Sequence, residues 1–196
     1  MLEITDIIGI IAFAISGFII GVRHKLDLLG ILISTFLTAL GGGILRDVIA
    51  NKAIYSFTNI LPGFLVFIVF LIGIIFKFYR FNFNNNLFLI FDSIGLVSFS
   101  ISGSIVAINT EFNIIGVIFL SFITAVGGGM LRDILINQIP FILKEEIYGS
   151  ISILIAIFLY IFFWNYSNSV SFYNGNFIKS NFLHKRLEIT NNLMYN

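Results

Sequence analysis

The sequence predicts an all-α integral membrane protein built from two inverted three-helix repeats, and three observations support this fold class. First, 58% of the 196 residues are hydrophobic and only 11% are charged, whereas soluble domains carry roughly 25% charged residues. Second, six apolar stretches are long enough to cross a bilayer as helices. Third, the chain repeats itself after a shift of 86 positions.

The six expected spans are joined by short connections that hold most of the charged residues. They cover about residues 4–22, 28–50, 61–79, 87–108, 114–137 and 147–165. The first span is not expected to be a cleaved signal peptide, because it begins with the acidic Glu3 and Asp6 rather than with positive charge. The last thirty residues contain no apolar run of spanning length.

The internal repeat has no gap, since residues 6–51 fall directly on residues 92–137. We therefore expect a first repeat over 1–86, a second over 87–165 and a polar tail over 166–196. Each repeat holds three spans, so the second copy must enter the membrane in the opposite direction. Inverted repeats of this kind are typical of transport proteins, whose sites lie near the midplane between the halves.

The loop charges predict how the chain lies in the membrane. Lysine and arginine gather in the cytoplasmic loops of membrane proteins. Five such residues fall on the side opposite the N-terminus: Arg23, Lys25, Lys77, Arg80 and Lys144. Lys52 is alone on the N-terminal side, the tail set aside. We expect the N-terminus to lie outside the cytoplasm, and a composition typical of A/T-rich bacterial genomes indicates a bacterial inner membrane.

Two glycine triplets lie inside the second and fifth spans, within the motifs GGGILRD and GGGMLRD. They are Gly41, Gly42, Gly43 and Gly127, Gly128, Gly129. Consecutive glycines remove side chains from much of a helix surface and lower the cost of leaving helical geometry. We predict a kink or short break in each span. Carbonyls freed there are tolerated only against protein or a water-filled cavity, and they suit a dehydrating cation.

A polar stripe with helical spacing runs into each triplet. Its members are Thr35, Thr38, Gly42 and Arg46 in one span and Ser121, Thr124, Gly128 and Arg132 in the other. A single polar stripe on an apolar helix lines either a pore or a neighbouring helix. We favour a pore, with tight packing of small residues as the alternative.

Four charged residues end the two motifs inside or near the bilayer, where each costs at least about 2.5 kcal/mol at the centre of a span. They are Arg46, Asp47, Arg132 and Asp133. Two interpretations stay open. The residues form structural ion pairs across the pseudo-two-fold axis, for example Arg46 with Asp133 and Arg132 with Asp47, or they line and gate a permeation path.

A further face of small and polar residues recurs in the first and fourth spans. It contains Asp6, Ser16, Gly17 and their equivalents Asp92, Ser102, Gly103. We expect a packing seam against the glycine-containing helices. Asp6 and Asp92 stand near helix starts, where a carboxylate suits the dipole, so capping is favoured over ion binding.

Composition excludes several function classes. The chain has no cysteine, and its histidines are His24 and His184 alone, so we expect no metal site and no cofactor. The net charge of +1 provides no basic patch for nucleic acid. No nucleophile triad or phosphate-binding loop is present, and an enzyme is not expected.

These motifs resemble those of the prokaryotic trimeric intracellular cation channel (TRIC) family. The shared patterns are D-x-x-G-x-x-x-F-x-x-S-G and G-G-G-x-x-R-D in both repeats, and P-x-x-L-x-x-E-I-Y over residues 140–148. The resemblance implies seven spans, a homotrimer, and a pore in each protomer that passes K⁺ and, to a lesser degree, Na⁺. The family domain has also carried a glycine-transporter label.

We consider three functions. The first is a K⁺-preferring channel, and the alternatives are a carrier for a small solute such as glycine and a non-transporting membrane scaffold. The chain departs from the family at its end, where the seventh span is missing or corrupted. We interpret the tail as a frameshift product of that span, with a naturally divergent tail as the alternative.

Overall fold

The computed structural model describes residues 2–81, 83, 85–144 and 149–165, and the regular elements within these ranges are all helices. In chain order they are α1 (Leu2–Arg23), α2 (Leu28–Ile49), α3 (Tyr55–Thr58), α4 (Ile60–Ile75), the 3-10 helix η1 (Phe78–Arg80), α5 (Asn85–Asn109), α6 (Ile114–Leu135), η2 (Phe141–Leu143) and a final helix Gly149–Asn165. The predicted all-helical fold is confirmed. The tail over 166–196, with its proposed frameshift, lies outside the described residues.

Four of these helices, α1, α2, α5 and α6, are long and apolar enough to cross a membrane. The helices α4 and Gly149–Asn165 stand at predicted spans but are shorter. The helix α4 ends at Ile75 rather than at residue 79, because Lys77 has a φ of 55° that α-helical geometry excludes. The direction in which the second repeat crosses the membrane stays a prediction.

The turns that follow α1 and α5 are built alike. Lys25 and Glu111, which are 86 positions apart, both have a positive φ, of 53° and 58°. The Oδ1 atoms of Asp27 and Asn113 then each accept a hydrogen bond from the backbone N–H three residues on, at 2.7 and 2.9 Å. These N-caps satisfy an N–H that would otherwise lack a partner at the start of α2 and α6.

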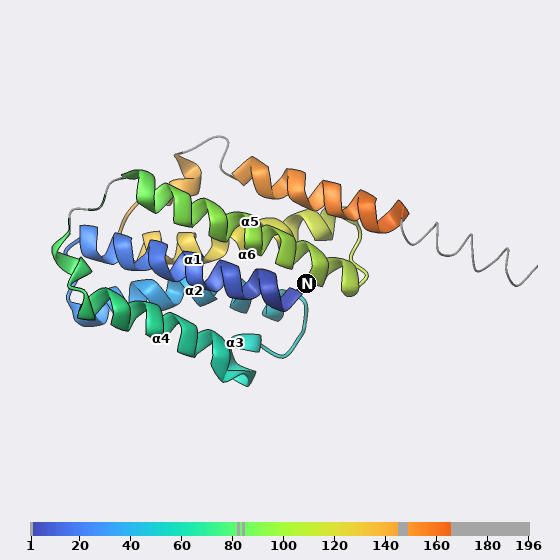
Figure 1. Ribbon diagram of the computed structural model, residues 1–196. Helices are drawn as coiled ribbons and strands as arrows, with labels where there is room; N and C mark the ends of the chain where they lie inside the picture. The colour runs from blue at the N-terminus through green and yellow to red at the C-terminus, as the bar shows by residue number, and fades with distance from the viewer. Residues whose placement is uncertain (1, 82, 84, 145–148, 166–196) are drawn as a thin grey trace, which may run out of the picture. The chain divides into compact units, whose positions relative to one another are not determined.

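The core within residues 2–159 is formed by α1, α2, α5 and α6 (Figure 1). The helix α1 packs against α2 and α5, α6 packs against α2 and α5, and α4 lies against α1 and α2. The rings of Phe13 and Phe99 meet edge to face in the centre, with centroids 5.3 Å apart. A Cβ at Gly95 would overlap the ring of Phe13, and one at Gly9 would stand 2.6 Å from that of Phe99. The duplicated glycines thus make room for the duplicated rings.

Residues 160–165 belong to a second compact unit. The aromatic rings of Tyr160 and Trp164 stack there, with centroids 6.4 Å apart.

Candidate functional site

The two glycine triplets lie where α2 and α6 come together. The α-helix continues through both triplets, so the predicted break is wrong; the alternative form of that prediction, a kink, stays untested. A Cβ at Gly42 would overlap the carbonyl oxygen of Thr124, and a Cβ at Gly128 would overlap that of Thr38. The glycines therefore permit close backbone contact between α2 and α6. Because both helices continue through their triplets, no break frees a backbone carbonyl there.

The other triplet glycines divide into two kinds. Gly41 and Gly127 face leucine side chains of the opposite helix, because added Cβ atoms would lie 2.9 and 2.8 Å from Leu131 and Leu45. An added Cβ at Gly43 would meet nothing within 4 Å. An added Cβ at Gly129 would lie 3.6 Å from the Arg132 guanidinium, an ordinary van der Waals contact. The third glycine of each triplet is therefore free of the helix contact.

The polar stripe is fully buried and satisfied within the core. Thr35, Thr38 and Thr124 each donate a hydrogen bond to the carbonyl four residues earlier, at 2.6, 2.7 and 2.5 Å. Ser121 donates instead to the carbonyl of Ser100 on α5, at 2.9 Å. These contacts are those of packed helices, and bonds of the threonine type bend a helix slightly. The role of the stripe in lining a pore stays a prediction.

A charged network lies at one end of the core, where α1 begins and α2 ends. The guanidinium of Arg46 donates to Asp6 at 2.7 Å and to Asp47 at 2.8 Å, and it also contacts Ser102. The Ser102 hydroxyl donates to the same Asp6 oxygen at 2.5 Å. The other oxygen of Asp47 accepts from the backbone N–H of Tyr55 at 2.8 Å. We call these four side chains the Arg46 network.

The equivalent network lies at the other end, 86 positions on. Arg132 donates to Asp133 at 2.8 Å, to Asp92 at 3.2 Å and to Ser16 at 3.1 Å. Ser16 donates to Asp92 at 2.7 Å. The second oxygen of Asp133 accepts from the N–H of Phe141 at 2.8 Å. We call this set of four side chains the Arg132 network.

These networks correct two sequence predictions. The proposed pairs of Arg46 with Asp133 and Arg132 with Asp47 are wrong, since each arginine bonds the aspartate beside it and one on a neighbouring helix. Sequence neighbours point about 100° apart on a helix, but the long arginine side chain reaches across that angle. Asp6 and Asp92 act as ion-pair partners in place of the favoured capping role.

Both networks connect three helices and remain fully bonded. The Arg46 network uses α1, α2 and α5, and the Arg132 network uses α1, α5 and α6. Among the described residues, no buried side-chain nitrogen or oxygen lacks a hydrogen-bond partner. Removing water from such charges costs several kcal/mol for each ion, and complete bonding of this kind offsets that cost. The seam glycines Gly17 and Gly103 lie nearby, against Thr38 and Thr124.

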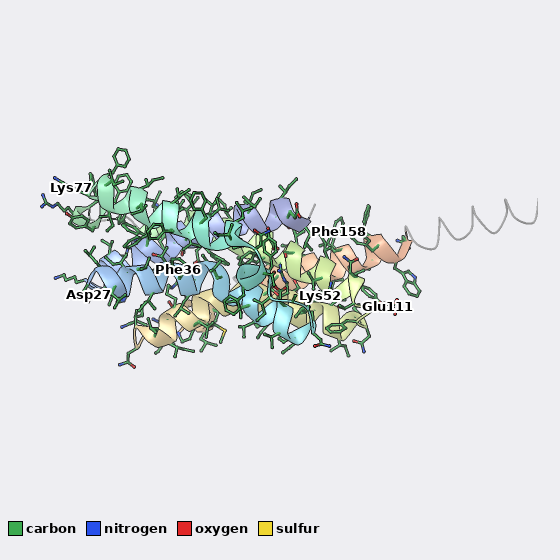
Figure 2. All side chains as sticks on the ribbon, turned by 90° about the horizontal axis from the view of Figure 1, so that it is seen from below. Asp27, Phe36, Lys52, Lys77, Glu111 and Phe158 are labelled. Atoms are coloured by element: carbon green, nitrogen blue, oxygen red, sulfur yellow. The ribbon has the colours of Figure 1, made fainter. Side chains whose placement is uncertain are left out.

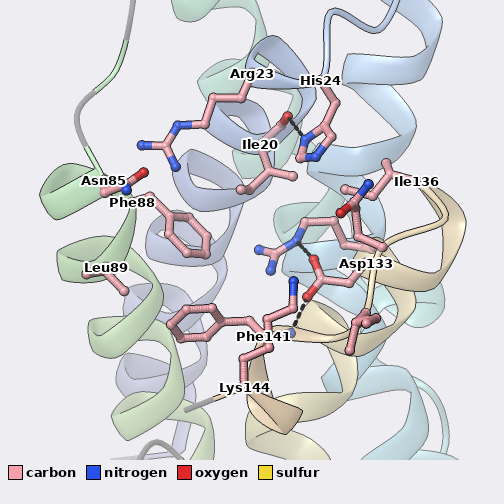
Figure 3. Close-up of a pocket in the computed structure, with 13 residues that line it drawn as sticks. Ile20, Arg23, His24, Asn85, Phe88, Leu89, Asp133, Ile136, Phe141 and Lys144 are labelled. Atoms are coloured by element: carbon pink, nitrogen blue, oxygen red, sulfur yellow. Dashed lines mark hydrogen bonds and ion pairs between the residues drawn. The ribbon is translucent and has the colours of Figure 1, made fainter.

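Each network contributes side chains to the lining of a cavity. The basic vestibule, a cavity of about 290 Å³ beside the Arg132 network, is drawn in Figure 3. Its lining residues are Ile20, Arg23, His24, Asn85, Phe88, Leu89, Arg132, Asp133, Ile136, Gln138, Ile139, Phe141 and Lys144. The acidic vestibule, of about 270 Å³, lies at the opposite end. Its lining residues are Leu2, Glu3, Asp6, Arg46, Asp47, Lys52, Ala53, Tyr55, Val106 and Asn109.

Sequence reasoning missed an aromatic contact in the basic vestibule. The ring of Phe88 has the guanidinium of Arg132 at 5.2 Å and that of Arg23 at 5.6 Å from its centroid. Cations at this distance are attracted to the face of an aromatic ring. The repeat offers no signal for the contact, because the equivalent position in the first repeat is Leu2.

Comparisons with known proteins place these features in a family context. A family model described as Glycine transporter matches residues 3–80 and 89–165. A UPF0126 membrane protein of Deinococcus radiodurans is 34% identical over 155 residues, which are 74% of this chain and 68% of that protein.

Two solved structures share the fold. A TRIC cation channel structure is 38% identical with a TM-score of 0.69, over 78% of this chain and 75% of that one. The trimeric intracellular cation channel orthologue from Rhodobacter sphaeroides is 25% identical with a TM-score of 0.76, over 83% and 84% of the two chains.

Proposed function

This chain belongs to the membrane-protein family described as Glycine transporter, and from that membership and the geometry above we propose that it is a cation channel. The likeness to TRIC channel structures confirms the family resemblance that the paired motifs predict. The observation that carries the proposal is a 38% identity, across three quarters of both chains, to a cation channel of the same fold.

The proposed permeation path runs inside each protomer, between the two vestibules. Each vestibule ends at a charged network, and the α2–α6 contact at Gly42 and Gly128 lies between them. In this proposal the path is closed at Gly42 and Gly128, because backbone carbonyls of the opposite helix lie against these glycines. A small separation of α2 from α6 would expose the Thr38 and Thr124 carbonyls, which are suitable ligands for a dehydrating cation.

We further propose a preference for K⁺ over Na⁺, a homotrimeric assembly, and a bacterial inner membrane with the N-terminus outside the cytoplasm. The trimer is supported by the name of the Rhodobacter sphaeroides orthologue. The orientation is supported by loop charges, since Arg23, Lys77 and Lys144 stand on the side opposite the N-terminus.

The direct test is an electrical recording from purified protein in a planar bilayer under a KCl gradient. We expect discrete single-channel steps and a reversal potential close to that of K⁺. The family description favours one other candidate, a carrier for glycine. Saturable uptake of radiolabelled glycine without current steps would overturn the channel in favour of this carrier.

A second recording tests where the path runs. Replacing Thr38 and Thr124 with valine removes two hydroxyls while nearly preserving the side-chain volume, so we expect a changed unitary conductance. Thr58→Val is the matched control, because Thr58 is an exposed threonine on α3 that also bonds to backbone carbonyls. An unchanged conductance in the double variant would place the path away from the stripe.

A further inference from the structure

The basic vestibule carries an excess of positive charge among its described lining residues. Arg23, Arg132 and Lys144 face a single carboxylate, that of Asp133. Arg132 is shared between Asp133 at 2.8 Å and the buried Asp92 at 3.2 Å, so its network holds two carboxylates for one arginine. Together with Arg23 and the exposed Lys144, the described residues of this mouth and its network carry one net positive charge.

The acidic vestibule has the opposite balance. Its carboxylates are Glu3, Asp6 and Asp47, and its cations are Arg46 and Lys52. Within this vestibule, the Arg46 network holds two aspartates for one arginine. The charge of Lys52 offsets that of the exposed Glu3. The described lining residues of this vestibule are left with one net negative charge.

The phenol of Tyr55 provides a second sign of this negative field. Burial, together with the nearby carboxylates of Glu3 and Asp6, raises the pKa of Tyr55 above its ordinary value. Carboxylates have this effect because they disfavour a further negative charge. The same field attracts cations to the acidic vestibule.

We propose that this charge asymmetry makes the conductance rectify, so that cations pass more readily from the acidic to the basic vestibule than in reverse. The inference rests on the proposed channel function. A cation that enters at the acidic end comes from a mouth enriched in cations, whereas one that enters at the basic end comes from a depleted mouth. Fixed mouth charges therefore change the current in one direction more than in the other.

The expected size follows from the charge difference between the vestibules. The vestibules differ by two charge units, and two charge units at about 7 Å from a cation change its local concentration roughly two- to threefold in 0.1 M salt. Screening shortens to about 3 Å in 1 M salt. The ratio of the two currents should therefore fall toward one as the salt concentration rises.

The test measures single-channel currents at equal and opposite voltages in symmetric 0.1 M KCl. We expect a current ratio of roughly two to three, and Lys144→Glu should bring it to one or below. Lys77→Glu is the matched control, because Lys77 is exposed at the same end (Figure 2) and is outside the lining of the basic vestibule. Glu3→Lys should also reduce the current ratio. Its control is Glu111→Lys, because Glu111 is exposed at the end of the acidic vestibule but is outside its lining.

The side from which a channel is recorded can be identified chemically. The chain has no cysteine, so Lys144→Cys supplies a single thiol at the basic mouth. A negatively charged thiol reagent added to that side should lower the ratio, and a positively charged one should restore it.

The outcomes separate this inference from the channel proposal. A linear current–voltage relation at 0.1 M salt, or equal effects of Lys144→Glu and Lys77→Glu, would overturn the rectification while leaving the channel intact. The absence of any current would instead count against the channel.

Discussion

The Arg46 and Arg132 networks contain the same residue types 86 positions apart, yet they differ in how their arginines are held. Arg46 lies 2.7 Å from Asp6, whereas Arg132 lies 3.2 Å from Asp92. Arg132 has an aromatic ring, that of Phe88, at 5.2 Å, where the first repeat has Leu2. The bonded groups are kept in both copies, while the residues around them have diverged.

This difference teaches that duplication preserves what a buried charge requires and leaves its surroundings free to change. Both arginines keep two aspartates and a serine, because a buried guanidinium without partners is costly. The vestibule next to each network meets water, so its charges can differ between the repeats. The proposed rectification depends on that divergence.

The largest expected effect comes from removing either arginine. Arg46→Ala and Arg132→Ala each leave two buried carboxylates without their cation, and we expect a loss of about 3–5 kcal/mol in unfolding free energy. Unfolding in mixed detergent micelles measures both, with the exposed Arg80→Ala as control.

A double variant sharpens this test of the pairing. Adding Asp6→Ala to Arg46→Ala should recover part of the loss, since one stranded carboxylate is removed, whereas adding Asp133→Ala should not. Purely additive losses with Asp6→Ala would contradict the observed ion pair.

Within one glycine triplet, the second and third glycines should respond differently to substitution by alanine. We expect Gly42→Ala to destabilise the protein by about 1–3 kcal/mol, because the new methyl group meets the Thr124 carbonyl. Gly43→Ala has open space and should stabilise α2 by up to about 1 kcal/mol through helix propensity. The test compares the thermal unfolding of Gly42→Ala and Gly43→Ala. Equal changes in stability for the two variants would contradict the close contact at Gly42.

The smallest effect should come from making the second network resemble the first. Phe88→Leu removes the ring contact with Arg132, and we expect a loss of about 0.5–2 kcal/mol in unfolding free energy. The exposed Phe76→Leu is the control. If Phe88→Leu costs no more than this control, the ring does not hold Arg132.

The sequence alone predicted the all-helical membrane fold and the positions of its long helices. The second span, predicted over 28–50, is observed as Leu28–Ile49. Apolar run length and the polar turn residues are local properties, so they can be identified without the tertiary structure. The repeat also singled out Arg46 and Arg132 as a matched pair of intramembrane charges, and both are found in ion pairs, although with other partners than predicted.

Only the tertiary structure decided which groups meet. The pairing of Arg46 with Asp6 joins two helices, and nothing in hydropathy or spacing distinguishes Asp6 from Asp133 as its partner. The glycine triplet suggested a break from its local flexibility, but the backbone of α6 against Gly42 gives it a packing role in an unbroken helix. Local sequence sets where a helix begins and ends, whereas its partners depend on how the helices cross, which is a property of the whole core.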